Sequence, residues 1–319
     1  MRWHDLPSPL VVILGATAVG KTEISIRLAE HFGAEIVSAD SRLFYRGMDI
    51  GTAKPTPEEL ARVPHHLIDV TTPDHPWSLA VYKKAAELAI DGIHARGKLP
   101  FLVGGTGQYI QAVLEDWSIP AQQPDPRMRQ ALNHWAQSIG ADELHRKLSI
   151  LDPVAAMTIQ SSNLRRTIRA LEVIFGTGRR FSDQRRRKGS RFSLLKIGLR
   201  RPRVELYRRI DERIQQMIQA GLIEEVRALL EKGYDRHLPA MSAIGYREIS
   251  AYLNDEITLD QAIAQIKKLT RIFVRRQANW FKESDATIHW FSVGDATLDQ
   301  IIQLLESGQG WIESTHRAG

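Results

Sequence analysis

The segment from Gly15 to Thr22 carries the complete phosphate-binding pattern G-x-x-x-x-G-K-[ST]. It directly follows Leu10–Leu14, an all-apolar run typical of a buried strand, and it leads into residues 23–30, where apolar side chains recur at helical spacing. Strand, glycine-rich loop and helix N-terminus in this order turn the loop amides and the helix dipole toward one anion. The pattern therefore predicts a phosphate or pyrophosphate site at the end of a buried strand.

The side chains and the backbone of this loop have different predicted roles. Lys21 is expected to reach the terminal phosphate, and the Thr22 hydroxyl is expected to bind the magnesium ion (Mg2+) that the phosphate carries. The other positions are expected to contribute mainly backbone amides: Gly15, Ala16, Thr17, Ala18, Val19 and Gly20. The same fingerprint is typical of nucleotide-binding and ATP-binding proteins, so the loop alone does not identify the anion.

Apolar runs and helical segments alternate along much of the chain. Further strands are predicted at residues 34–39, 99–103, 194–199 and 286–291. This alternation predicts an α/β fold with a parallel sheet and right-handed crossovers. Ligands of such sheets gather at the carboxyl ends of the strands, so Thr17, Asp40 and Thr106 are expected to share one crevice.

The pattern changes between residues 122 and 192. Apolar side chains there recur at helical spacing, no strand is predicted, and an arginine-rich stretch follows Gly178. We therefore predict a helical insertion domain at 122–192 within a core domain formed by residues 1–121 and 193–319.

The net charge of +6 is unevenly distributed over the 319 residues. Between Arg165 and Arg209 there are 16 Lys and Arg residues against three acidic residues, a local net charge of +13. Such a basic segment favours a polyanionic partner, most plausibly nucleic acid, although a solvated helix face followed by a basic loop gives the same pattern.

Cysteine content and hydropathy exclude several classes of protein. With no cysteine, the chain has neither disulfides nor thiolate metal sites, which fits a reducing compartment. No apolar run approaches the roughly 18 residues of a membrane span, so we expect a cytoplasmic protein without a membrane partner. The surface pattern shows no spare apolar stripe, and a monomer is expected.

Polar residues after the predicted strands are the candidates for chemistry. Asp40 is placed to bind magnesium or to take a proton from a nucleophile, but it is equally suited to cap a helix. Gly104 and Gly105 permit close backbone approach beside the Thr106 hydroxyl, which is weak evidence taken alone. Arg213 is expected to reach a pyrophosphate, with surface ion pairing as the alternative.

Two classes of enzyme fit these features. One is a small-molecule or nucleotide kinase in which the loop binds ATP. The other is a transferase that acts on a nucleic acid and releases pyrophosphate. The kinase hypothesis leaves two observations unexplained, because the basic segment exceeds what a lid over ATP needs and no strand ending in a Walker B aspartate is evident before residue 122.

Longer motifs resemble the family of tRNA dimethylallyltransferases. The stretch from Gly47 to Pro55 is the most specific of them, and the resemblance covers about residues 10 to 290. The matching segments, in the order of the family, are residues 14–22, 38–42, 45–55, 64–69, 103–107, 125–129, 169–173 and 243–248.

The resemblance implies a P-loop NTPase-like fold and a prenyl transfer. The dimethylallyl group of dimethylallyl diphosphate would move to N6 of the adenosine 3′ of the anticodon, in tRNAs that read codons beginning with U. The products would be N6-isopentenyladenosine and pyrophosphate. The loop would then hold the diphosphate with Mg2+ instead of ATP, and the insertion would bind the anticodon stem of the tRNA. Among the members of this family, the resemblance is to the bacterial type.

The resemblance also implies roles for individual residues. Asp40 matches the catalytic base, Thr106 would bond near the reacting amine, and Arg213 would help Thr17 to hold the diphosphate. Residues that match tRNA contacts are Asp40, Ser41, Arg42, Leu43, Thr106, Arg129, Arg165, Arg166, Thr167, Ile168, Arg169, Ser242, Ala243, Ile244, Gly245, Tyr246 and Arg247. Leu43 and Ser242 depart from the family pattern, which puts fine contacts to the anticodon loop in question but not the reaction.

Overall fold

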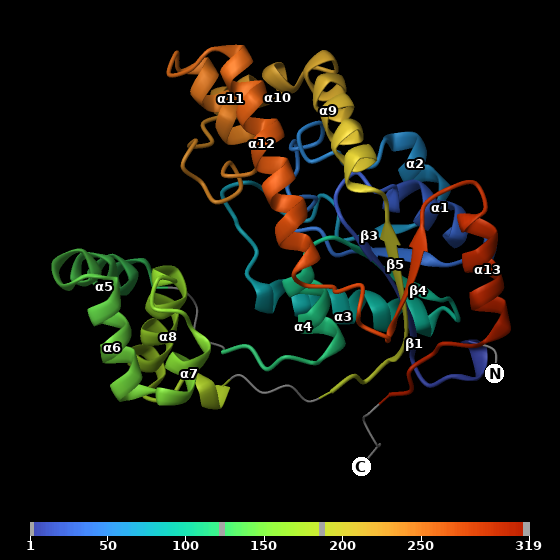
Figure 1. The fold of residues 1–319 in the computed structure, drawn as a ribbon, viewed down its shortest axis with the longest axis horizontal. Coiled ribbons are helices and arrows are strands. Elements are labelled where there is room, and N and C mark those ends of the chain that lie inside the picture. The colour runs from blue at the N-terminus through green and yellow to red at the C-terminus, as the bar shows by residue number, and fades with distance from the viewer. Residues whose placement is uncertain (1–2, 121–124, 185–188, 315–319) are drawn as a thin grey trace. The chain divides into compact units, whose positions relative to one another are not determined.

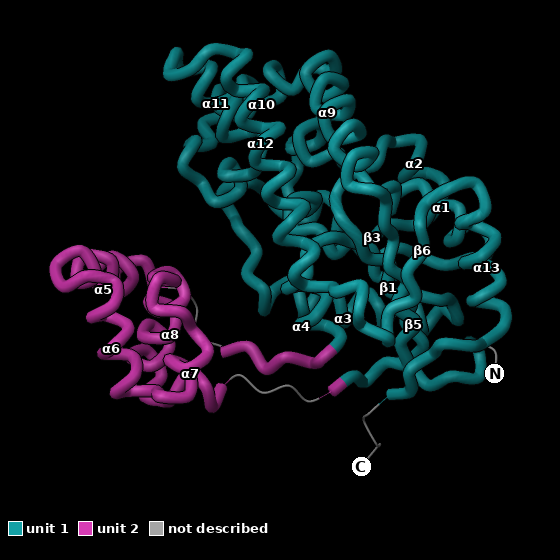
Figure 2. The backbone as a smooth tube through the Cα atoms, in the orientation of Figure 1, with its two compact units in different colours: residues 1–114, 190–319 teal, residues 115–189 magenta. Residues whose placement is uncertain are grey.

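The computed structural model describes residues 3–120, 125–184 and 189–314. Two compact units make up the chain, one of residues 1–114 with 190–319 and one of residues 115–189 (Figure 2). The smaller unit begins at Glu115 and ends at Gly189, whereas the insertion domain was predicted at 122–192. Below, the larger is called the sheet unit and the smaller the helical unit.

The sheet unit is built on a six-stranded sheet in which every neighbouring pair of strands is parallel. The spatial order is β3-β2-β4-β1-β5-β6. The strands are β1 (Pro9–Gly15), β2 (Glu35–Ser38), β3 (His65–His66), β4 (Pro100–Gly104), β5 (Ser193–Arg200) and β6 (Ile288–Ser292). The α/β fold and the five predicted strands are confirmed. Only β3 was not predicted, because two residues are too short to show a period.

Strand β1 lies inside the sheet, between β4 and β5, and is buried on both faces. Val11 and Ile13 pack into one hydrophobic cluster, and Leu10, Val12 and Leu14 pack into another. Because successive side chains of a strand point to opposite faces, an uninterrupted apolar run fits a strand that is covered by helices on both sides.

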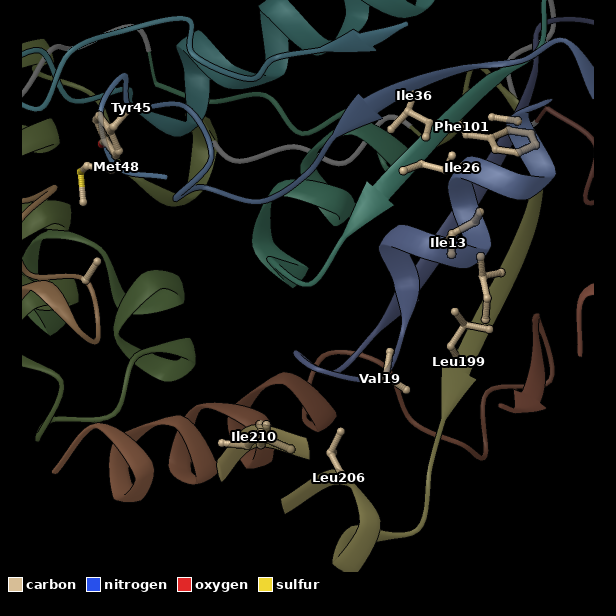
Figure 3. Close-up of a cluster of buried hydrophobic side chains, with 14 of the residues drawn as sticks. Ile13, Val19, Ile26, Ile36, Tyr45, Met48, Phe101, Leu199, Leu206 and Ile210 are labelled. Atoms are coloured by element: carbon tan, nitrogen blue, oxygen red, sulfur yellow. The ribbon is translucent and has the colours of Figure 1, made fainter. Parts of the chain in front are cut away.

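Helices cover both faces of this sheet (Figure 1). Helix α1 packs on β1, β2 and β4 and also contacts α13, while α3 and α4 pack on the opposite cluster with β2 and β4. These four helices and the short α2 are α1 (Lys21–Phe32), α2 (Pro57–Arg62), α3 (Leu79–Ala95), α4 (Gly107–Leu114) and α13 (Thr297–Ser307). The buried side chains of the first cluster include Ile13, Ile26 and Phe101 (Figure 3).

Four more helices follow β5 and pack against one another. They are α9 (Arg203–Gln219), α10 (Leu222–Glu231), α11 (Tyr246–Leu253) and α12 (Leu259–Ala278). Helix α12 contacts both α9 and α11, and α10 contacts α9 and α11 (Figure 1). This group stands on the side of the sheet unit where the strands end, so it supplies side chains opposite the carboxyl ends of the strands.

The helical unit has its own hydrophobic core, formed by Leu144, Leu148, Ala170, Leu171 and Val173 among others. Its helices are α5 (Pro126–Ile139), α6 (Ala141–Leu151), α7 (Pro153–Thr158) and α8 (Leu164–Thr177). Across the described parts of both units, no helix is long and apolar enough to cross a bilayer.

Candidate active site

The phosphate loop begins where β1 ends and leads into α1, as the sequence pattern predicts. Gly20, immediately before the helix, has φ 110°, a left-handed conformation that favours glycine. Gly15 is required for a different reason, since a Cβ there would lie 2.6 Å from the Leu199 carbonyl oxygen of β5. Val19 points away from the site into the core, beside Leu199 (Figure 3). The loop is therefore held closely against the sheet.

Lys21 lies in the loop with its ammonium desolvated, although the residue keeps some exposed surface. Its Nζ donates to the Gly15 carbonyl at 3.0 Å and to the Ala16 carbonyl at 2.8 Å. Desolvation lowers the pKa of Lys21 to about 8; the nearby Asp40 carboxylate opposes this shift, and the Arg213 guanidinium adds to it. Lys21 is thus a cation that an anionic ligand would stabilise.

Two arginine side chains donate hydrogen bonds to backbone carbonyl groups of the phosphate loop. Arg201 Nε donates to the Val19 carbonyl at 2.9 Å, and Arg209 Nε donates to the Ala18 carbonyl at 2.9 Å. In a trans peptide the carbonyl and the following amide point in opposite directions, so the bond from Arg201 turns the Gly20 amide away from that arginine. Arg209, one helical turn before Arg213 on α9, therefore supports the backbone of the loop.

Asp40 and Thr106 follow the adjacent strands β2 and β4, and hydrogen bonds join their loops. The Thr106 amide donates to the Ala39 carbonyl at 3.3 Å, and the Thr106 hydroxyl oxygen accepts from the Ser41 amide at 3.3 Å. One Asp40 oxygen, Oδ1, accepts from the Arg42 amide at 3.0 Å. Asp40 therefore does not cap a helix, because a turn at 41–44 follows it and not a helix. Its bond to the Arg42 amide stabilises that turn.

These loops open into a crevice of about 400 Å³ within the sheet unit. It brings together ten of the predicted site residues: Thr17, Ala18, Asp40, Ser41, Arg42, Thr106, Arg213, Ala243, Ile244 and Gly245. Burial lowers the pKa of Arg213, while the charge of Asp40 favours its protonated form. With Lys21 and Arg213 near the carboxylate of Asp40, the surroundings of Asp40 have an excess of positive charge and suit an anion.

Much of the remaining lining of the crevice is apolar and was not predicted as a site. It is formed by side chains of α9, α10 and α12, and by Trp280 just after α12; the helical members include Ile210, Ile214, Met217, Leu222, Ile266 and Phe273. Along α12 the lining residues 266, 270, 273 and 277 follow helical spacing. This face of α12 is amphipathic, and its polar members Thr270, Arg276 and Gln277 also line the crevice.

Some residues that match tRNA contacts of the family are not available to a ligand. The Tyr246 side chain is fully buried and donates its hydroxyl to Glu225 Oε1 at 2.5 Å. Burial, together with the charge of Glu225, raises the pKa of Tyr246 well above its ordinary value. The Tyr246 side chain is therefore engaged in the core, and the contact of this residue to tRNA stays a prediction for its backbone. Its neighbours Ser242 and Arg247 line a different cavity, of about 490 Å³.

The family-specific stretch from Gly47 to Pro55 is fixed mainly by Glu225 of α10. The carboxylate accepts hydrogen bonds from the amides of Asp49, Ile50 and Gly51 at 2.9, 2.8 and 3.2 Å. Gly51 must be glycine, because a Cβ there would lie 2.5 Å from the Tyr246 ring. Gly51 and Thr52 then line the crevice. The stretch from Gly47 to Pro55 therefore forms part of the crevice wall, and Glu225 fixes its backbone.

We expect Glu225→Ala to lower the free energy of unfolding by about 2–4 kcal/mol, because three amides and one phenol lose a charged acceptor. A urea titration followed by circular dichroism measures this change. The matched control is Glu224→Ala on the same helix, an exposed side chain 3.9 Å from Arg227. Equal midpoints for the two variants would contradict the bracing role.

In the helical unit, the segment 165–169 presents only part of its length to solvent. Arg165 and Arg166 are exposed in the first turn of α8, whereas Thr167 and Ile168 are buried. The two pairs differ in burial because residues two positions apart lie on different faces of a helix, and the contacts of Thr167 and Ile168 to tRNA stay predictions.

Arg129 and Arg169 share one buried partner in the helical unit. Both donate to Glu172 Oε2, at 2.8 and 2.9 Å, and the Asp125 amide donates to the other oxygen at 2.8 Å. Burial alone would raise the pKa of Glu172, but the bonds from Arg169 and Arg129 outweigh it and leave the pKa below its ordinary value. Arg129 of α5 is therefore joined to α8 through Glu172, whereas Arg169 and Glu172 pair within α8.

The basic segment 165–209 is divided between the two units. Its first part belongs to the helical unit and its last part to the sheet unit. Several of its arginines are paired, among them Arg191 with Asp91, Arg200 with Glu283 and Arg201 with Glu205. Residues 185–188, its densest run of charge, lie outside the described residues.

Comparisons with known proteins agree on one family. The model of the IPP transferase family matches residues 43–284, and that of isopentenyl transferase matches residues 8–71. The tRNA dimethylallyltransferase of Roseiflexus sp. (strain RS-1) is 54% identical over 274 residues, which are 86% of this chain and 90% of that protein. The tRNA dimethylallyltransferase of Thermomicrobium roseum is 48% identical over 89% of this chain and 86% of that protein.

Solved structures give the same result. The tRNA isopentenylpyrophosphate transferase of Bacillus halodurans superposes with a TM-score of 0.71 at 42% identity, over 95% of this chain and 97% of that one. A eukaryotic dimethylallyltransferase, crystallised in a study of its action on tRNA, superposes with a TM-score of 0.76 at 26% identity. That match covers 94% of this chain and 77% of the eukaryotic one.

Proposed function

The chain belongs to the IPP transferase family of tRNA dimethylallyltransferases, and we propose from its site that it transfers a dimethylallyl group to N6 of the adenosine 3′ of the tRNA anticodon. The acceptors are tRNAs that read codons beginning with U, and the products are N6-isopentenyladenosine and pyrophosphate. The observation that carries the proposal is the crevice that places the phosphate loop, Asp40 and Thr106 together. A kinase is not supported, because the similar proteins are named as tRNA-modifying transferases.

The diphosphate of dimethylallyl diphosphate is the anion that we assign to the loop. Lys21, Arg213 and the amides of the loop would stabilise the charge that develops on the leaving oxygen as the C–O bond breaks. The same groups would stabilise a phosphate of ATP, but here an alkyl group is transferred. The apolar side of the crevice is suited to the five-carbon group, which exposes only hydrocarbon.

Magnesium is proposed as the cofactor. Within the described residues, no three His, Cys, Asp or Glu side chains cluster as a ready-made metal site. The Thr22 hydroxyl at the start of α1 fits an ion that takes most of its oxygen ligands from a diphosphate and water, as Mg2+ does. When bound, Mg2+ neutralises charge on the leaving diphosphate.

Asp40 is the group that we propose as the general base. The lone pair of adenine N6 is delocalised into the ring, so N6 attacks carbon well only if a base takes its proton as the N–C bond forms. Asp40 lies in the crevice with one oxygen committed to the Arg42 amide. The Thr106 hydroxyl, which also lines the crevice, would bond near the amine. The target base must leave its stack to reach these groups.

The exposed arginines of α8 are the proposed contacts of the helical unit to tRNA phosphates. Helix N-termini favour anions, yet the first turn of α8 holds Arg165 and Arg166 and no acidic residue. A pair of cations at the positive end of a helix is unfavourable without a ligand and is stabilised by a phosphate bound there. This argument supports a nucleic-acid contact at these two positions.

We expect Arg165→Ala with Arg166→Ala to weaken tRNA binding and to flatten its salt dependence. Each lost phosphate contact lowers the slope of log K against log[salt] by about 0.7–0.9. The control exchanges Arg208 and Arg227, two exposed arginines of the sheet unit, for alanine. Filter binding at several salt concentrations measures the slopes, and an unchanged slope in the α8 variant would remove these arginines from the interface.

The activity is tested with purified protein, magnesium, radiolabelled dimethylallyl diphosphate and an anticodon stem-loop RNA with A-A-A after the anticodon. We expect label to enter the RNA without ATP, and we expect no label when the target adenine is replaced by guanine. If no label enters, and ATP is instead hydrolysed or used to phosphorylate a small acceptor, the proposed function is wrong.

A further inference from the structure

One buried side chain joins the two loops that carry the reacting groups. Gln277, near the end of α12, accepts a hydrogen bond from the Thr17 amide through Oε1 at 2.9 Å. Its Nε2 donates to the Gly105 carbonyl at 3.0 Å. Thr17 belongs to the phosphate loop after β1, and Gly105 directly precedes Thr106 after β4. We propose that Gln277 is a positioning residue that fixes the donor loop relative to the acceptor loop; this inference rests on the proposed function.

The chemistry of the two bonds requires a side chain with both an acceptor and a donor. An amide N–H can only donate and a carbonyl oxygen can only accept, so the two bonds also fix which way round the Gln277 amide lies. The Gln277 residue is only 7% exposed, and the bond to Gly105 is buried. Water therefore cannot easily replace the side chain, and a residue of similar size without these groups would leave both backbone atoms unpaired.

The close approach of Gln277 to Gly105 leaves no room for a side chain at position 105. A Cβ on Gly105 would lie 2.3 Å from Gln277 Nε2, so any larger residue there would displace the amide. Gly105 and Gln277 line the crevice and also line a second cavity of about 560 Å³ that is bounded by Gly15 and Ala16. Gly105 and Gln277 therefore form part of the wall that the two cavities share.

This placement predicts a specific kind of kinetic defect. Gln277 bonds to the backbone of the two loops and supports the reaction through them. Transfer requires the prenyl carbon and adenine N6 to meet at about 3–3.5 Å, and a displacement of about 1 Å can cost 10²-fold in rate. Loss of the cross-link should therefore slow the transfer step much more than it weakens the binding of RNA.

The experiment compares wild type with Gln277→Met, which keeps the volume of the side chain and removes both hydrogen bonds. Single-turnover transfer at saturating dimethylallyl diphosphate and stem-loop RNA should be slower by about 30- to 100-fold. The dissociation constant for the RNA should stay within about twofold of wild type. Gly105→Ala, which attacks the same link from its other end, should give a similar defect, and the double variant should be no slower than the slower single variant. Gln303→Ala, an exposed glutamine on α13, is the control.

Each outcome decides the inference. If wild type itself transfers no label, the proposed function fails first, and the result is distinct from a failure of the Gln277 argument. If wild type is active, a Gln277→Met rate within threefold of it overturns the positioning role. A loss of RNA affinity equal to the loss of rate, or additive defects in the double variant, would also overturn it. Gly105→Ala supplies the answer if Gln277→Met does not fold.

Discussion

Asp40→Ala should lower the rate of dimethylallyl transfer by at least about 10²-fold while RNA affinity stays nearly unchanged. The carboxylate is the only acidic side chain lining the crevice in the part of the chain that the structure describes, so nothing there replaces it as a base. Single-turnover transfer and filter binding of the same stem-loop measure the two quantities separately.

The alanine variant also loses a structural bond, because Asp40 Oδ1 accepts from the Arg42 amide. Asp40→Asn keeps an oxygen for that amide and removes only the basic carboxylate. We expect Asp40→Asn to be as slow as Asp40→Ala, with the turn at 41–44 preserved. Asp295→Ala, an exposed carboxylate before α13, should behave as wild type. Wild-type turnover in Asp40→Asn would remove Asp40 as the base.

Lys21→Ala should raise the KM for dimethylallyl diphosphate by about 10²-fold, since a charge-assisted contact worth about 1.5–3 kcal/mol is lost together with two bonds to the loop carbonyls. The dependence on RNA concentration should change little. Lys232→Ala, an exposed lysine after α10, is the control. An effect of Lys21→Ala that appears only with ATP would instead revive the kinase alternative.

The lowered pKa of Lys21 adds a pH dependence to this prediction. Lys21 loses its proton in the free enzyme as the pH rises through about 8, while a diphosphate, with a last pKa near 6, is already fully ionised. Affinity for dimethylallyl diphosphate should therefore be flat from pH 7 to 8 and then fall by up to tenfold per pH unit. The Lys21→Ala variant should show no inflection near pH 8 in the same titration.

Local sequence was sufficient for the parts of the site that depend on neighbouring residues. The phosphate loop, the helix that follows it and the strands before them are determined by side chains within a few positions of one another. Asp40 and Thr106 were placed in the same crevice because parallel strands end at one edge of the sheet, a rule that requires only the order of strands and helices.

Other features depend on where distant elements meet, and local patterns carry no sign of them. Thr17 and Gln277 are 260 residues apart, and Glu225 is 174 to 176 residues from the amides that it holds. Side-chain bonds to a distant backbone leave no periodicity in the sequence. A motif match covers every residue of a segment, so the predicted tRNA contacts included Tyr246, Thr167 and Ile168. The packing of their helices buries these three side chains in the core.

The sequence by itself thus determined which anion-binding loop this protein has, where it lies in the sheet and which carboxylate faces it, because these follow from backbone geometry and strand order. Tertiary structure alone decided how the loop is supported, by Arg201, Arg209 and Gln277, and which residues of the family motifs are exposed. The physical reason is that support and exposure are set by where α9, α10 and α12 meet the loops of the site, which no single segment encodes.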